Sequence, residues 1–217
     1  MPERHSDGDT GTGRSVDRLI NFSDAVVAVA VTVLVLPLLD IEGPGEGQSV
    51  WTIVGDHASQ IWTFLFTFYV VAVMWLAHNR ILNAIKRYDP FIFWVNTTWL
   101  ACIVLLPWIS AMFGESQGGR SSVGLLYWGT MAAIAFVGSS LGWHLRRHPE
   151  LLADDAPVLS PGDQRRVNLR GPVMALFFLA IGLVSVFAPS VANWLPLGII
   201  PLSIWLRPAV NPVQDNI

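Results

Sequence analysis

The fold is decided by residues 18–38, RLINFSDAVVAVAVTVLVLPL. This stretch is long and apolar enough to cross a lipid bilayer as a helix, which takes about 20 mostly apolar residues. It nevertheless starts with Arg18, carries Ser23 and Asp24 further on and places Thr32 near its middle. An ionisable group near the centre of a membrane helix costs about 2.5 kcal/mol or more, so it is normally paired or faces water. The sequence therefore predicts a membrane helix whose polar groups have partners.

The composition of the whole chain is that of a polytopic membrane protein. Hydrophobic residues make up 53% of its 217 residues and charged residues only 13%, and the mean hydropathy is +0.50. These values are too apolar for an ordinary soluble domain of this size. We therefore expect an all-α integral membrane protein with six transmembrane helices. The six apolar segments are residues 19–39, 61–82, 91–113, 123–145, 169–188 and 191–206.

These segments define one transmembrane domain, residues 17–207, with little room for anything else. We expect residues 1–16 to form an N-terminal tail, irregular to about Gly13, and residues 208–217 a C-terminal tail. Residues 146–168 hold three prolines and mixed charges, which predicts a surface loop. The last segment is short and contains Pro196 and Pro201, so it is expected to be kinked or broken.

The basic residues predict the orientation of the chain in the membrane. Of thirteen Lys and Arg residues, only Arg120 falls on one side of the predicted helices, and the other twelve fall on the opposite side. Short loops rich in Lys and Arg stay in the cytoplasm. Both termini and the loop 146–168 are therefore expected to be cytoplasmic in this multi-pass protein.

The first apolar segment presents two faces with different chemistry. At about 100° per residue, Val29, Thr32 and Leu36 share one face, whereas Ser23 and Asp24 project well away from it. The Val29–Thr32–Leu36 stripe is compatible with ordinary helix packing or with the lining of a pore. Asp24 needs a partner near the same end of the bundle. The candidates are Arg18, Trp75, His78, Asn79 and Asn96.

Catalysis and metal binding find little support in the sequence. Ser23, Asp24 and His78 superficially offer a nucleophile and a base, but neighbouring residues on a helix point about 100° apart and there is no G-x-S-x-G motif. His144 and His148 are four residues apart but flank a predicted interface beside Pro149, which does not favour a metal site. We expect no enzyme activity, no cofactor and no nucleic-acid partner.

Three motifs together resemble a known family. Residues 18–24 follow the pattern R-x-x-x-F-S-D, the second segment ends with Trp75-x-x-His78, and the third begins near Asn96 and continues to Leu-Leu-Pro at 105–107. This combination resembles the transmembrane protein 175 potassium channels of bacteria, archaea and animal endolysosomes. The resemblance spans the first three segments, and the last three agree in number and length.

The resemblance implies a potassium-selective channel in a prokaryotic cell membrane. Four identical six-helix subunits would surround a central pore lined by the first helix, without the TVGYG filter that this sequence also lacks. By position in the motif, the layers of the hydrophobic constriction fall on Val29, Thr32 and Leu36. The structural polar network falls on Arg18, Ser23, Asp24, Trp75, His78 and Asn96. The partners would be further copies of the chain, the bilayer and permeating K⁺; the alternative function is a proton-coupled or other small-solute transporter.

Overall fold

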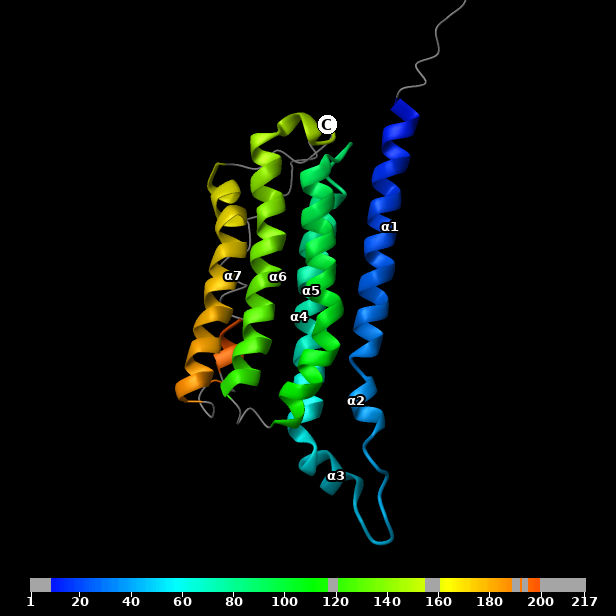
Figure 1. Ribbon diagram of the computed structural model, residues 1–217, viewed down its shortest axis with the longest axis vertical. Helices are drawn as coiled ribbons and strands as arrows, with labels where there is room; N and C mark the ends of the chain where they lie inside the picture. Colours follow the sequence, from blue (N-terminus) through cyan, green and yellow to red (C-terminus); the bar gives the residue numbers. More distant parts are fainter. Residues whose placement is uncertain (1–8, 117–120, 155–160, 189–191, 193–194, 200–217) are drawn as a thin grey trace, which may run out of the picture.

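Long helices running along a common direction dominate the part of the chain that the structure describes (Figure 1). The computed structural model describes residues 9–116, 121–154, 161–188, 192 and 195–199. The long helices are α1 (Asp9–Val33), α4 (Ala58–Leu82), α5 (Pro90–Glu115), α6 (Ser121–Arg147) and α7 (Pro161–Phe187). The short ones are α2 (Leu36–Leu39), α3 (Val50–Asp56), η1 (Pro149–Leu151) and η2 (Leu195–Gly198).

The helices pack in an order that leaves α1 at the edge of the bundle. Helix α5 contacts α1, α4 and α6, and α6 packs extensively on α7. Helix α1 lies against α4 and α5 and makes no such contact with α7 (Figure 1). One side of α1 is therefore covered by α4 and α5, and its other side is open within the described part of the chain.

Five helices in the described ranges are long and apolar enough to cross a membrane, and they correspond to the first five predicted segments. Large apolar side chains are exposed along them, among them Trp94, Val104, Phe136 and Leu176. Such exposure is costly in water and suits contact with lipid. The sixth predicted segment, 191–206, falls mostly outside the described residues, and the tail 208–217 falls wholly outside them, so both stay predictions.

The helix boundaries differ from the predicted ones in two places. Helix α1 begins at Asp9 and α7 begins at Pro161. The chain is thus helical within the stretch to Gly13 that was expected to be irregular, and within the part of the predicted loop 146–168 that follows Pro161. Polar residues at helix ends carry no apolar periodicity, so the sequence pattern gave no sign that these two helices extend so far.

The first predicted segment, 19–39, lies within one candidate membrane span, Ser15–Leu39, but a turn divides its helix into α1 and α2. Leu34 and Val35 form a turn between α1 and α2, and the Val35 N–H reaches the Thr32 carbonyl at 3.4 Å. The physical reason is Pro37, which lacks the N–H that would bond to the carbonyl of Val33 and whose ring crowds the preceding turn. Leu36 is consequently on a separate helical segment from Val29 and Thr32.

Helix α5 has a well-defined start. Asp89 caps it, with its Oδ1 accepting from the Ile92 N–H at 2.8 Å, and Pro90 occupies the first helical position. Both choices are favourable because the first N–H groups of a helix lack intrahelical partners.

Two apolar clusters hold the bundle together. The larger one joins α4, α5, α6 and α7 through fully buried side chains that include Trp99, Tyr127, Trp128 and Phe178. The smaller one lies at the end of the bundle where α4 ends and α5 begins, which we call the α4–α5 end. Its buried members are Val16, Ile20, Leu82, Ile85, Ile92, Leu141, Leu145 and Leu151.

Candidate functional site

The two faces of α1 differ in exposure as the periodicity predicted. Leu19, Ser23, Val27 and Ala30 are buried against α4 and α5. The opposite face is open, with Val29 63% exposed. Thr32 and, beyond the turn, Leu36 are also exposed. The three residues predicted to line a pore are therefore all exposed in the described part of the chain.

A buried hydrogen-bonded chain ties α1 to α5 and α4 through Ser23, Asn96 and His78. The Asn96 amide Nδ2 donates to Ser23 Oγ at 2.9 Å, and Ser23 Oγ donates onward to the Leu19 carbonyl at 2.8 Å. The His78 Nε2 lies 2.9 Å from the Asn96 Oδ1. Because that amide oxygen can only accept, Nε2 must carry the proton. All hydrogen bonds in the chain therefore run in one direction, from α4 through α5 into the backbone of α1.

The other ring nitrogen of His78 has no hydrogen-bond partner within the described ranges. With Nε2 protonated, a neutral His78 presents Nδ1 as an acceptor, and this atom is buried without a hydrogen bond among the described residues. The ring stacks flat on Trp99, with centroids 4.0 Å apart and planes 2° from parallel. This stack fixes the plane of the imidazole and so the direction of its bond to Asn96.

Asp24 forms the second connection between α1 and α4. Its Oδ1 accepts from the Trp75 indole N–H at 2.8 Å and from the Asn79 amide at 3.0 Å. The Asn83 amide in turn donates to the Asn79 Oδ1 at 2.7 Å. That bond settles which end of the Asn79 amide faces Asp24, since the oxygen is occupied by Asn83. The carboxylate of Asp24 is thus held by two donors that are themselves oriented.

The structure brings together five of the six residues predicted for the polar network, in two separate groups. Ser23, His78 and Asn96 form one, and Asp24 and Trp75 form the other. Arg18 is not brought into either group: its side chain is exposed, with no hydrogen bond or ion pair to the described part of the chain. It precedes Phe22 and Val29 at helical spacing, on the open face of α1.

Asn79, Asn83 and Trp99 also contact the two polar groups, although they are not among the six residues predicted for the network. Asn79 was a candidate partner of Asp24, and the geometry supports that choice. Asn83 could have been found, because it lies four residues after Asn79 on the same helix face. Trp99 carried no usable signal, since its contact with His78 depends on the distance between α4 and α5.

The exposed hydroxyl of Thr32 is already engaged within its own helix. Its Oγ1 donates to the Val29 carbonyl at 2.7 Å. With the proton directed at the backbone, the lone pairs of the oxygen remain available to an external donor or a cation. The open face of α1 is thus apolar at Val29 and Leu36 and carries an acceptor between them.

Comparisons with known proteins identify the family of the chain. The sequence model of a family described as "Endosomal/lysosomal potassium channel TMEM175" matches residues 18–107, the region that contributes every residue of the two polar groups. A potassium channel of Streptomyces collinus is 30% identical in an alignment of 176 positions that covers 79% of this chain and 84% of that protein. The chain belongs to the TMEM175 family.

Other TMEM175 relatives span bacteria and animals. A potassium channel of Chamaesiphon minutus is 28% identical over 84% of this chain and 88% of that protein. The mouse relative, named an endosomal/lysosomal proton channel, is 28% identical over 87% of this chain but only 41% of its own length. The family is one of ion channels, and its bacterial relatives here are named potassium channels.

A solved structure extends the agreement to the TMEM175 fold. The crystal structure of a lysosomal potassium-selective channel TMEM175 homolog from Chamaesiphon minutus superposes with a TM-score of 0.71. It covers 89% of this chain and 99% of the other, at 22% sequence identity. At that identity the match shows a shared arrangement of the helices and nothing further.

Proposed function

We propose that the protein is a potassium-selective channel that conducts K⁺ passively through a hydrophobic constriction formed by α1 and α2. The observation that carries the proposal is the two-faced environment of α1: Ser23 and Asp24 fix one face to α4 and α5, while Val29 and Thr32 are exposed on the other. A helix held on one side and open on the other is suited to line a space between subunits. The names of the bacterial relatives support K⁺ as the permeating ion.

A homotetramer would convert this open face into a pore. Four copies around a central axis would stack rings of Val29, Thr32 and Leu36. A narrow ring of apolar side chains expels water, so an ion crosses it only after losing part of its hydration shell. K⁺ loses hydration at lower cost than Na⁺, and four Thr32 oxygens with free lone pairs would partly replace the lost water. The chain contains no TVGYG filter that could act instead.

Conduction is tested by reconstitution into liposomes with Val29→Ala as the informative variant. Because a wider ring demands less dehydration, K⁺ flux should rise roughly two- to tenfold and the preference over Na⁺ should fall, a tenfold change being about 1.4 kcal/mol of barrier. Val104→Ala removes the same two methyl groups from an exposed site on α5 and should change neither quantity. The native mass of the purified protein should equal that of four 23.9 kDa chains.

Two results would count against the channel. Equal fluxes for Val29→Ala and Val104→Ala would show that α1 does not line the pathway. Flux that saturates at low K⁺ and requires a proton gradient would favour the transporter alternative. The animal relatives are named proton channels, so proton conduction is a second candidate; proton flux without K⁺ flux would select it.

The orientation proposed for the chain has both termini and the segment between α6 and α7 in the cytoplasm of a prokaryotic cell. The basic residues support it, since the α4–α5 end carries Arg80, Lys86 and Arg87. Reporter fusions at Gly45 and Ser160 should land on opposite sides of the membrane, with Ser160 inside. Reporters that both respond on the same side would contradict this orientation.

A further inference from the structure

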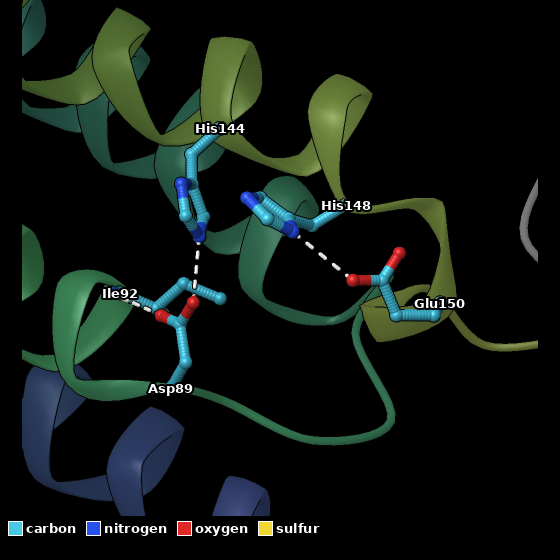
Figure 2. A network of polar contacts seen from close by, with 5 residues as sticks. All are labelled: Asp89, Ile92, His144, His148 and Glu150. Carbon is cyan, nitrogen blue, oxygen red and sulfur yellow. Dashed lines mark hydrogen bonds and ion pairs between the residues drawn. The ribbon is translucent and has the colours of Figure 1, made fainter.

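Two histidine–carboxylate contacts lie at the α4–α5 end, outside the two polar groups of α1 (Figure 2). The Asp89 Oδ2 accepts from the His144 Nε2 at 2.7 Å, while its other oxygen caps α5. The His148 Nδ1 lies 3.0 Å from the Glu150 Oε1. Asp89 is the N-cap residue of α5, His144 lies in the last turn of α6, His148 follows α6 directly, and Glu150 belongs to η1. We call these four residues the histidine–carboxylate cluster.

The two imidazole rings of the cluster are neighbours. Their centroids are 4.5 Å apart, and His144 also stacks on Phe91 at 4.3 Å. Two protonated imidazoles at this distance would repel each other, but each has its own carboxylate partner. The cluster can therefore hold two protons while its charges remain balanced.

The carboxylates of the cluster stay ionised across the pH range in which histidines titrate. Partial burial by itself would raise the pKa of Asp89, but the Ile92 N–H and His144 outweigh it and hold that pKa below its usual value. The pKa of Glu150 is lowered by its own backbone N–H and by His148, with Arg87 adding to the effect. An imidazole ordinarily titrates near pH 6.5. Near neutral pH both carboxylates therefore carry a negative charge and can pair with a protonated imidazole.

Several other charged side chains lie at this end of the bundle, and some of them have partners outside the histidine–carboxylate cluster. The Arg146 guanidinium donates to the Gly142 carbonyl, Arg147 lies 3.8 Å over the Trp143 ring, and Lys86 pairs with Asp154. The remaining ones, by element, are Asp17 and Arg18 on α1, Arg80 on α4, Arg87 in the α4–α5 turn and Arg165, Arg166 and Arg170 on α7.

The cluster is mechanically connected to α1. Two backbone hydrogen bonds join the α4–α5 turn to the η1 region, from the Lys86 N–H to Leu151 at 3.0 Å and from the Ala153 N–H to Ala84 at 2.9 Å. Beneath them lies the smaller apolar cluster, whose members include Val16 and Ile20 of α1. Contacts that hold the α4–α5 turn against the end of α6 therefore also hold in place the apolar surface on which the start of α1 packs.

We propose that Asp89, His144, His148 and Glu150 form a proton-binding site that, when occupied, clamps the α4–α5 turn to the end of α6 and so steadies the start of α1. Each bound proton turns a hydrogen bond between a neutral imidazole and a carboxylate into an ion pair. The stabilisation is present at low pH and is lost as pH rises through the histidine range. It fails on the acid side only where the carboxylates themselves take up protons. The binding of protons does not depend on the proposed conduction of K⁺.

Hydrogen exchange of the full-length protein in detergent tests the site. Peptides covering residues 16–22 of α1 are compared between the wild type and the His144→Gln/His148→Gln variant at the same pH, which cancels the intrinsic pH dependence of exchange. At pH 6 the variant should exchange roughly two- to tenfold faster than the wild type, and at pH 8 the two should agree. His57→Gln removes a histidine bonded to Gln60 at the start of α4 and should follow the wild type at both values.

A second variant keeps the test decisive if the double variant does not fold. Asp89→Asn retains an oxygen to cap α5 and removes the charge that pairs with His144. Its exchange should therefore also be faster than that of the wild type at pH 6 and equal to it at pH 8. A ratio of variant to wild-type exchange that is the same at both pH values overturns the proposal. So does a pH-dependent ratio for His57→Gln of the same size. Either result would leave the proposed conduction of K⁺ untouched.

Discussion

Replacing Asn96 with leucine should lower the free energy of unfolding by about 2–3 kcal/mol. The side chain is fully buried, and leucine fills a similar volume while removing both its acceptor and its donor. The His78 Nε2–H would then be buried with no acceptor, and Ser23 would lose its bond from α5. An unsatisfied buried donor costs about 1–3 kcal/mol, more than an ordinary hydrogen bond contributes. Denaturant unfolding in detergent measures the loss.

The neighbouring residue provides the control. Thr97 lies on the same helix, is only partly buried and donates its hydroxyl to the Phe93 carbonyl of its own helix. Thr97→Val should change stability by no more than about 0.5 kcal/mol. If Asn96→Leu is as stable as Thr97→Val, the Ser23–Asn96–His78 chain does not hold α1 to the bundle.

The same substitution, glycine to alanine, should have opposite effects at two positions in the α6–α7 region. At Gly171 a methyl group would overlap the Ser139 Cβ, lie 2.9 Å from its hydroxyl oxygen and 3.3 Å from the Ala135 carbonyl. Helix α7 would have to move away from α6, and overpacking of this kind costs about 1–3 kcal/mol. At Gly129 on α6 nothing lies within 4 Å of the added atom, so Gly129→Ala should stabilise the helix by about 0.5–1 kcal/mol.

A compensating change distinguishes crowding from any other defect of Gly171→Ala. Ser139→Gly removes the side chain with which the new methyl group collides, so the double variant should recover most of the lost stability. The midpoints of thermal unfolding are compared in one detergent for the wild type, Gly129→Ala, Gly171→Ala and the Gly171→Ala/Ser139→Gly double variant. Equal unfolding midpoints for Gly129→Ala and Gly171→Ala would mean that α6 and α7 accommodate the added methyl group at Gly171 with no loss of stability.

The sequence predicted best what depends on one helix at a time. The 3.6-residue repeat separated Ser23 and Asp24 from Val29 and Thr32, and the structure places them on covered and open faces respectively. The depth of polar residues along their helices was enough to select Trp75, Asn79 and Asn96 as neighbours of α1. Both arguments work because the membrane restricts each helix to nearly the same direction.

Features that depend on the distance between helices could not be predicted from the sequence. The stack of His78 on Trp99 and the close approach at Gly171 require α4, α5, α6 and α7 to be placed to within about an ångström. The turn at Leu34–Val35 was a different case. Pro37 was visible, but prolines also occur inside membrane helices without ending them, as Pro107 does in α5.

The division of α1 into a covered face and an open one separates positions where a substitution threatens folding from positions where it does not. Residues that bond to α4 and α5 contribute to folding, so a change there risks losing the protein before its permeation can be altered. Val29, Thr32 and Leu36 are all exposed, and Leu36 lies beyond the turn at Leu34 and Val35. Substitutions at these positions are therefore expected to leave the fold of the chain intact, and under the proposed function they would change the ion preference on an unchanged scaffold.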